Sequence, residues 1–448
     1  MRDVFQRFLP VFLAAITFLI RYVIWTYFAT AANFSVWDPH IYIPAGKRYV
    51  EGILRGNFTV FMENVEHPPL GKLIIGVGIH LFRFLDEFSA ASLIMIIVNT
   101  ATALILYKIG ELYYGRRLGL ITWGLYTFDP FSIEWTLAWL DASLNFFITL
   151  SFYFMIKVFK SKTMNRHWIT IGVIGGLGIL CKYVGIPYFT ILVILMFFDN
   201  YYRRYIVRII SLAVLTAIIL NPQIYYMAMI SRAVQINLQY NNLLVPGVLC
   251  GVFKTGKLIT AIWYILTYLG LGYTGPYVAP YVIPVIFLAL LIYRRVFDKE
   301  FVNSDALRWL SSSLLTLLFL PRNYWVYFGE FWEMKSNVLA KFFFPYYYSI
   351  TIPPAAFMTA TMICGPREKF SETKTYEKLL AVFPLSFAVL SPFSLTSALV
   401  YPWWDFLFTL MINYDKGGVL TTMGLQAFAV TIWIIALLIM GLTLYLKK

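Results

Sequence analysis

Long apolar runs recur from one end of the chain to the other, separated by short loops that carry Lys and Arg. A helix needs roughly 17–25 apolar residues to cross a bilayer, and in lipid the backbone must satisfy its own hydrogen bonds. Only 13% of the 448 residues are charged, whereas a soluble domain carries about 25%. The pattern predicts an all-α polytopic membrane protein with about twelve transmembrane helices.

Basic residues next to the apolar runs set the expected orientation. Arg2 and Arg7 precede a first span at about residues 8–31, so we expect the N-terminus in the cytoplasm. Later spans are expected at about 89–109, 118–128, 142–159 and 168–182, followed by seven more that end near Arg203, Asn221, Arg294, Pro321, Cys364, Ser391 and Lys447. Both termini of this integral, multi-pass membrane protein are then cytoplasmic.

The net charge of +14 would indicate nucleic-acid binding in a soluble protein. Here the Lys and Arg residues concentrate in loops expected on the cytoplasmic side, as membrane insertion requires. We therefore predict no nucleic-acid partner. Cys181, Cys250 and Cys364 are scattered, without the spacing of a zinc site or an even disulfide framework.

The first long polar stretch, residues 32–88, is expected on the extracytoplasmic side. Residues 42–55 place apolar side chains on one helical face and charged side chains on the other, which predicts a helix lying in the membrane interface. Residues 70–84 are apolar but short for a span and are followed by charged residues. We expect a second interfacial or half-inserted helix there.

Two features of this loop indicate chemistry, because ionisable groups beside a membrane are often functional. Asp38 directly follows the first span; its carboxylate can act as a base, or simply cap an interfacial helix. The segment HPPLGK at residues 67–72 fixes an extended turn with two prolines before Lys72 opens an apolar helix. Lys72 can snorkel to the interface or neutralise a lipid-linked phosphate.

Asp38 followed by HPPLGK resembles the protein O-mannosyltransferase family, the dolichyl-phosphate-mannose–protein mannosyltransferases of the glycosyltransferase C superfamily. The stretches DPFSIEWTLAWLDASLNFF at 129–147 and CKYVG at 181–185 are similar to later parts of that family. The resemblance covers about residues 20–200. It implies a single transmembrane glycosyltransferase domain over 1–448, with the catalytic module in 1–200, including the outer loop 32–88, and a variable transmembrane module in 201–448.

The resemblance also implies a reaction. A hexose, such as the mannose that the family name gives, would move with inversion from a polyprenyl or dolichyl phosphate donor to a hydroxyl acceptor on the extracytoplasmic face. Asp38 matches the family's first-loop aspartate, the general base, and base assistance contributes about 10²–10⁴ in rate. Cations must stabilise the departing phosphate, and the candidates are Lys72, His67, Lys182 and Arg322.

The acceptor is a protein or lipid hydroxyl, and the residues expected to bind it are Asp141, Glu134, Glu66 and His40. Asp141 heads an incoming helix, so its carboxylate can equally serve the helix dipole. No cofactor is required; a divalent metal, as in oligosaccharyltransferases, is not favoured, because Lys and Arg can balance one phosphate. Two positions depart from the family: Pro39 replaces a glutamate and Thr136 replaces an arginine, which is why Arg322 is considered.

Two other functions remain open at this point. An aminoarabinose-transferase-like enzyme would transfer its sugar to a lipid acceptor. A secondary transporter would also have about twelve spans, but it would place ionisable groups at mid-membrane between two structural repeats. The two halves of this chain show no visible similarity, and the notable charges lie at outer loop ends.

Overall fold

The computed structural model describes residues 2–31, 37–65, 67–127, 140–162, 164, 167–198, 202–225, 304–318 and 349–364. Within these ranges the chain forms α-helices and short 3-10 helices, and no strand occurs among them. The prediction of an all-helical fold is therefore confirmed. The expected spans that end near Arg294, Ser391 and Lys447 lie outside the described residues, so the count of about twelve stays a prediction.

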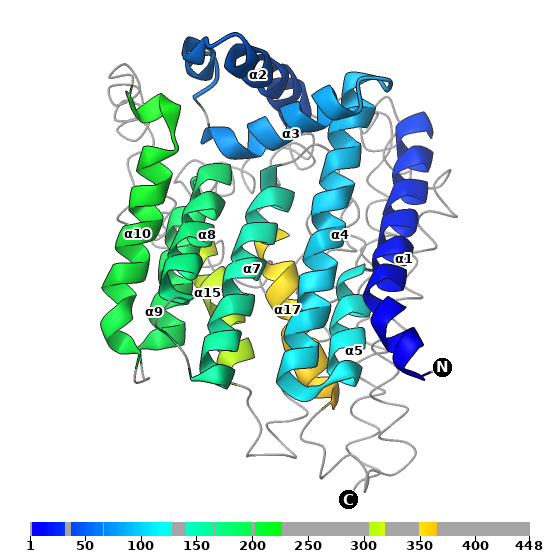
Figure 1. The fold of residues 1–448 in the computed structure, drawn as a ribbon, viewed down its shortest axis with the longest axis vertical. Coiled ribbons are helices and arrows are strands. Elements are labelled where there is room, and N and C mark those ends of the chain that lie inside the picture. The colour runs from blue at the N-terminus through cyan, green and yellow to red at the C-terminus, as the bar shows by residue number, and fades with distance from the viewer. Residues whose placement is uncertain are drawn as a thin grey trace, which may run out of the picture.

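Most helices run side by side along the long axis of the molecule (Figure 1). They are α1 (Arg2–Ala31), α4 (Glu87–Tyr114), α5 (Arg116–Thr127), α7 (Leu140–Ser161), α8 (His167–Cys181), α9 (Gly185–Phe197), α10 (Ile206–Ile219), α15 (Ser304–Leu318) and α17 (Ile352–Cys364). The helices expected from the apolar runs up to residue 225 are thus present close to their expected ends. The N-terminus and the connections after α4, α7 and α9 lie at one end of the bundle.

Two helices, α2 (Trp37–Leu54) and α3 (Pro69–Leu81), lie across the opposite end of the bundle. They cross where two glycines meet: a Cβ on Gly76 would lie 2.0 Å from the carbonyl oxygen of Gly46. Only glycine allows backbones to approach this closely. The short 3-10 helix η1 (Phe58–Met62) lies in the loop between them.

The start of α4 fixes this end cap to the bundle. Asp86 caps the helix, because its Oδ1 accepts a hydrogen bond from the backbone N–H of Ser89 at 2.9 Å. On the next residue, the carboxylate of Glu87 accepts a bond from Nζ of Lys47 on α2 at 2.6 Å. Helix α2 is therefore attached both to α3 beneath it and to the first turn of α4.

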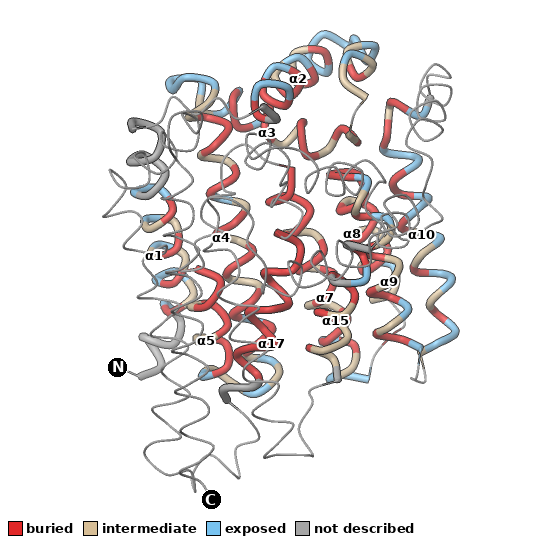
Figure 2. The backbone as a smooth tube through the Cα atoms, turned by 180° about the vertical axis from the view of Figure 1, so that it is seen from behind, coloured by how far each residue is buried: buried red, intermediate tan, exposed pale blue. Residues whose placement is uncertain are grey.

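Exposed residues lie on the outer faces of the peripheral helices, whereas buried residues face the middle of the bundle (Figure 2). On the outer helix α10, Val207, Leu215 and Ile219 are 72%, 50% and 53% exposed. Inside, Asn99 and Thr149 are buried. Soluble proteins rarely expose such continuous apolar surface, whereas small and polar residues are typical between membrane helices. Among the described residues, α4 and α7 are long and apolar enough to cross a bilayer.

Helix α7 lies at the centre and is packed by distant segments of the chain. The ring of Phe152 stacks on Trp309 of α15 with centroids 4.0 Å apart, and Phe357 of α17 packs edge-on against Phe152. These contacts anchor the middle of α7, the helix that carries Asp141 in its first turn. The core therefore positions the residues described next.

Candidate functional site

The candidate site lies where α3 begins, above the start of α7 and the end of α8. Gly71 brings these three elements together, because a Cβ there would lie 2.9 Å from Cδ2 of Leu140 and 3.2 Å from the carbonyl oxygen of Cys181. Pro69 is the first residue of α3, a position that tolerates its missing N–H. The HPPLGK turn is thus placed directly against the residues that neighbour Asp141 and Lys182.

Lys72 is fully buried in the first turn of α3. Its Nζ donates hydrogen bonds to the carbonyl oxygen and Oδ1 of Asn64, both at 2.8 Å, and to the carbonyl oxygen of His67 at 2.7 Å. The ammonium group also lies 5.5 Å from the centre of the Tyr49 ring. Lys72 therefore holds the end of the loop that precedes its own helix.

The carbonyl oxygen of Asn64 accepts two further hydrogen bonds. The hydroxyl of Tyr49 on α2 donates to it at 2.7 Å, and Nε2 of Gln223 donates to it at 3.0 Å. Gln223 belongs to η3 (Pro222–Tyr225), which follows α10. Three elements far apart in the sequence thus converge on one backbone oxygen next to Lys72.

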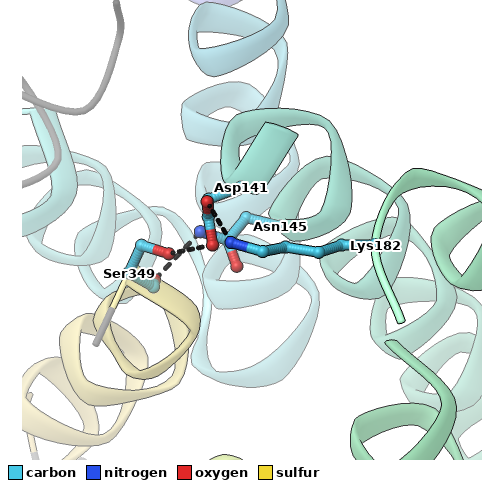
Figure 3. A network of polar contacts seen from close by, with 4 residues as sticks. All are labelled: Asp141, Asn145, Lys182 and Ser349. Atoms are coloured by element: carbon cyan, nitrogen blue, oxygen red, sulfur yellow. Dashed lines mark hydrogen bonds and ion pairs between the residues drawn. The ribbon is translucent and has the colours of Figure 1, made fainter. Parts of the chain in front are cut away.

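Lys182 and Asp141 form a buried ion pair at the same end of the bundle (Figure 3). Nζ of Lys182 lies 2.7 Å from Oδ2 of Asp141, and the two side chains are 2% and 1% exposed. Ser349, just before α17, donates its hydroxyl to the other carboxylate oxygen at 3.1 Å. Asn145, one turn further along α7, donates its amide to the carbonyl oxygen of Ser349 at 2.9 Å.

His67 lies between these two lysines. Burial of the imidazole lowers its pKa well below the usual range, and the nearby charges of Lys182 and Lys72 lower it further. Its ring packs edge-on against Tyr42 with centroids 5.8 Å apart. The Nδ1 atom is buried and forms no hydrogen bond with any of the described residues. His67 is therefore held neutral at physiological pH.

The structure brings four of the predicted site residues together: His67, Lys72, Asp141 and Lys182. The backbone of Asp38 lies in the first turn of α2, but its side chain is outside the described part of the chain. His40 is exposed on α2. The other predicted residues, Glu66, Glu134 and Arg322, lie outside the described residues, and so do the loops around the last two.

Sequence reasoning did not assign a site function to Tyr49, Asn64, Asn145, Gln223 or Ser349. Tyr49 was assigned only to the apolar face of an interfacial helix. The sequence feature that could have indicated Gln223 is its position just after a span that is expected to end near Asn221 on the extracytoplasmic side. For Ser349, which lies 208 positions from its partner Asp141, local sequence offers no comparable signal.

Chemically, this arrangement buries the ammonium group of Lys72 and the Lys182–Asp141 ion pair near a neutral imidazole. Such fixed cations can stabilise an anion that develops during a reaction. Within the described ranges no group of three metal-binding side chains occurs. Because Glu66 and Glu134 lie outside those ranges, the expectation that no metal is required stays a prediction.

A comparison with protein-family profiles matches residues 66–226 to the family described as dolichyl-phosphate-mannose-protein mannosyltransferase. This range begins one residue before the HPPLGK segment and includes Asp141, Lys182 and Gln223. The predicted resemblance to the protein mannosyltransferases is confirmed over residues 66–226. Curated proteins give no match to the chain.

A solved structure with a similar fold supports the helical architecture of this chain. ArnT from Cupriavidus metallidurans bound to undecaprenyl phosphate is similar with a TM-score of 0.54 and 14% identity, over 93% of this chain and 75% of that one. The archaeal oligosaccharyltransferase AglB from Archaeoglobus fulgidus, in complex with an inhibitory peptide and a dolichol-phosphate, gives a TM-score of 0.44 and 11% identity, over 88% of this chain and 56% of that one.

Proposed function

We propose that this chain is a membrane glycosyltransferase that moves a hexose, in the first instance mannose, from a polyprenyl or dolichyl phosphate to a hydroxyl acceptor. The observation that carries the proposal is the pair of buried lysines, Lys72 and Lys182, both near enough to His67 for their charges to lower the pKa of its imidazole. A departing lipid phosphate requires fixed positive charge of this kind. The undecaprenyl phosphate bound to ArnT supports a polyprenyl phosphate as the carrier.

Lys72 can reach a phosphate without losing its place in the loop. Two of its three oxygen partners are backbone carbonyl groups, whereas the third, Oδ1 of Asn64, belongs to a rotatable side chain. A phosphate oxygen can replace that amide oxygen and form a charge-assisted hydrogen bond. Lys182 is the second phosphate-binding candidate, because Asp141 already accepts one of its hydrogen bonds and offsets its charge.

Asp38 is the proposed general base. It would take the proton of the acceptor hydroxyl as that oxygen attacks the anomeric carbon, and the sugar–phosphate bond breaks with inversion. Its position in the first turn of α2, the helix that lies over the Lys72 segment, supports this assignment. Glu66, Glu134, Asp141 and His40 remain the proposed acceptor-binding residues, and Arg322 a further phosphate-binding candidate.

The active site is proposed to lie on the extracytoplasmic face. Arg116, Arg117, Arg203 and Arg204 flank the connections after α4 and α9, at the same end of the bundle as the N-terminus. Basic loops of membrane proteins stay in the cytoplasm, so α2 and α3 at the opposite end would face outward. Both termini are proposed to be cytoplasmic.

The test is incubation of the purified protein with radiolabelled dolichyl phosphate mannose and a membrane extract. We expect label in the protein fraction; label in the lipid fraction would instead favour an aminoarabinose-transferase-like lipid acceptor. If neither fraction carries label, the proposal is contradicted, and a secondary transporter is the alternative function that remains. Asp38→Asn should abolish transfer, whereas Glu51→Gln, on the same helix, should not. EDTA should leave turnover unchanged, since no metal is required.

A further inference from the structure

Gln223 lies far along the chain from the proposed donor site, yet its side chain ends beside Lys72. It is fully buried, and its backbone N–H donates to Oδ1 of Asn221 at 3.1 Å, which fixes the turn after α10. From that turn, Nε2 lies 3.0 Å from the carbonyl oxygens of both Phe61 and Asn64. Gln223 thus binds the loop between α2 and α3 from below.

The two acceptors of Gln223 differ in their other partners. Phe61 lies in the last turn of η1, where carbonyl groups have no donor within the helix. Asn64 follows η1, and its carbonyl oxygen also accepts from Nζ of Lys72. The amide of Gln223 therefore fixes the orientation of a peptide group that itself fixes a catalytically important cation.

The same carbonyl oxygen is held from above by Tyr49. The hydroxyl of Tyr49 donates to Asn64, and its ring packs on Phe61 with centroids 4.5 Å apart. Gln223 and Tyr49 hold this loop together, since Nε2 of Gln223 also lies 3.4 Å from the hydroxyl oxygen of Tyr49. If a phosphate displaces the side chain of Asn64, the carbonyl oxygens of Asn64 and His67 still hold Lys72 in place.

We propose that Gln223 is a positioning residue: it holds the Asn64 carbonyl group so that the ammonium of Lys72 is directed at the phosphate of the lipid carrier. The inference rests on the proposed function, because it acts through the phosphate contact of Lys72. The Oε1 atom of Gln223 is buried without a partner among the described residues. Leaving this oxygen unpaired costs free energy, so the hydrogen bonds of Nε2 must be what mainly stabilises the Gln223 side chain in this position.

The test is a double-mutant cycle on the full chain in detergent, with undecaprenyl phosphate as the binding probe. Gln223→Leu has a similar length, removes the unsatisfied oxygen and should still fold. We expect it to weaken binding about tenfold, since two hydrogen bonds are lost. In a Lys72→Met background the same change should have no further effect, because coupled residues are not additive.

Thr216→Val, a buried change in the last turns of α10, is the matched control and should leave binding unchanged in both backgrounds. Tyr49→Phe provides a second variant if Gln223→Leu does not fold. It removes another donor to the Asn64 carbonyl while keeping the ring, and we expect about threefold weaker binding, again only when Lys72 is present.

Two results would overturn the inference. If Gln223→Leu weakens the binding of undecaprenyl phosphate equally with and without Lys72, its effect is a general structural one. If Gln223→Leu leaves that binding unchanged, Gln223 does not position Lys72. Failure of the proposed function gives a different result: Lys72→Met alone would then bind undecaprenyl phosphate as tightly as the unaltered protein.

Discussion

The ammonium group of Lys182 lies 2.7 Å from the carboxylate of Asp141, and both side chains are almost completely buried. The pair joins the end of α8 to the start of α7, and Ser349 extends it to the turn before α17. Burying two charges is costly unless they remain paired. This ion pair is therefore sensitive to any change that removes one partner only.

Asp141→Asn should destabilise the protein by about 3–5 kcal/mol, because it leaves Lys182 in a buried site without this carboxylate. The double variant Asp141→Asn with Lys182→Met should recover much of that loss. Chemical unfolding in detergent measures both. Lys108→Met, which removes the exposed pair between Lys108 and Glu111, should cost less than about 1 kcal/mol. Equal costs for Asp141→Asn and Lys108→Met would contradict this account.

Much of the helical fold could be predicted from the sequence, because apolar runs and basic loops report directly on membrane helices. Helix α4 covers Glu87–Tyr114 where a span was expected at about 89–109. Helix α3 ends at Leu81, short of a full crossing, as its length and the following charges indicated. The distances at which chain segments meet, however, are set by packing.

In the candidate site, too, some features could be predicted from the sequence and others are set by packing. His67 and Lys72 belong to one short motif, so their proximity followed from sequence. The family resemblance gave Lys182 and Asp141 separate roles, and the ion pair between them, 41 positions apart, was not predicted. Gln223 and Ser349 could not be found this way, because their hydrogen bonds depend on how α10 and α17 pack rather than on any local pattern.

A second prediction concerns the crossing of α2 and α3. Gly76→Ala should destabilise the protein by about 1–3 kcal/mol and reduce sugar transfer, because the new Cβ would lie 2.0 Å from the carbonyl oxygen of Gly46. The helices would have to separate, and Lys72 would move with α3. Thermal unfolding and transfer assays measure the two effects.

The control for this crossing is Gly124→Ala in α5, where an added Cβ meets nothing within 4 Å. Alanine is favoured over glycine inside helices by about 0.5–1 kcal/mol, so this variant should be at least as stable as the unaltered protein. If both substitutions had the same effect, close packing at Gly76 would not explain the result.

The third prediction tests Lys72 as a phosphate ligand. Lys72→Met should weaken binding of undecaprenyl phosphate by about 10–100-fold, the value of one charge-assisted hydrogen bond. Lys47→Met, on the exposed side of α2 with its side chain 44% exposed, removes the same charge at the same end of the molecule. Binding that falls equally in both variants would point to general electrostatic attraction instead.

The last prediction concerns pH and His67. Burial and the charges of Lys182 and Lys72 lower the pKa of this imidazole in the folded protein, whereas the unfolded chain has a pKa of about 6.5. The unfolded state therefore binds more protons below about pH 6.5, and stability is lost as the pH falls.

For a folded pKa far below 6.5, this linkage amounts to about 1 kcal/mol between pH 6.5 and 5.5. His67→Gln should remove this part of the acid sensitivity, measured as the change in unfolding free energy across that interval. His40→Gln, at an exposed position on α2, should leave it in place. If His67→Gln were as acid-sensitive as the unaltered protein, the imidazole would not be held neutral between the two lysines.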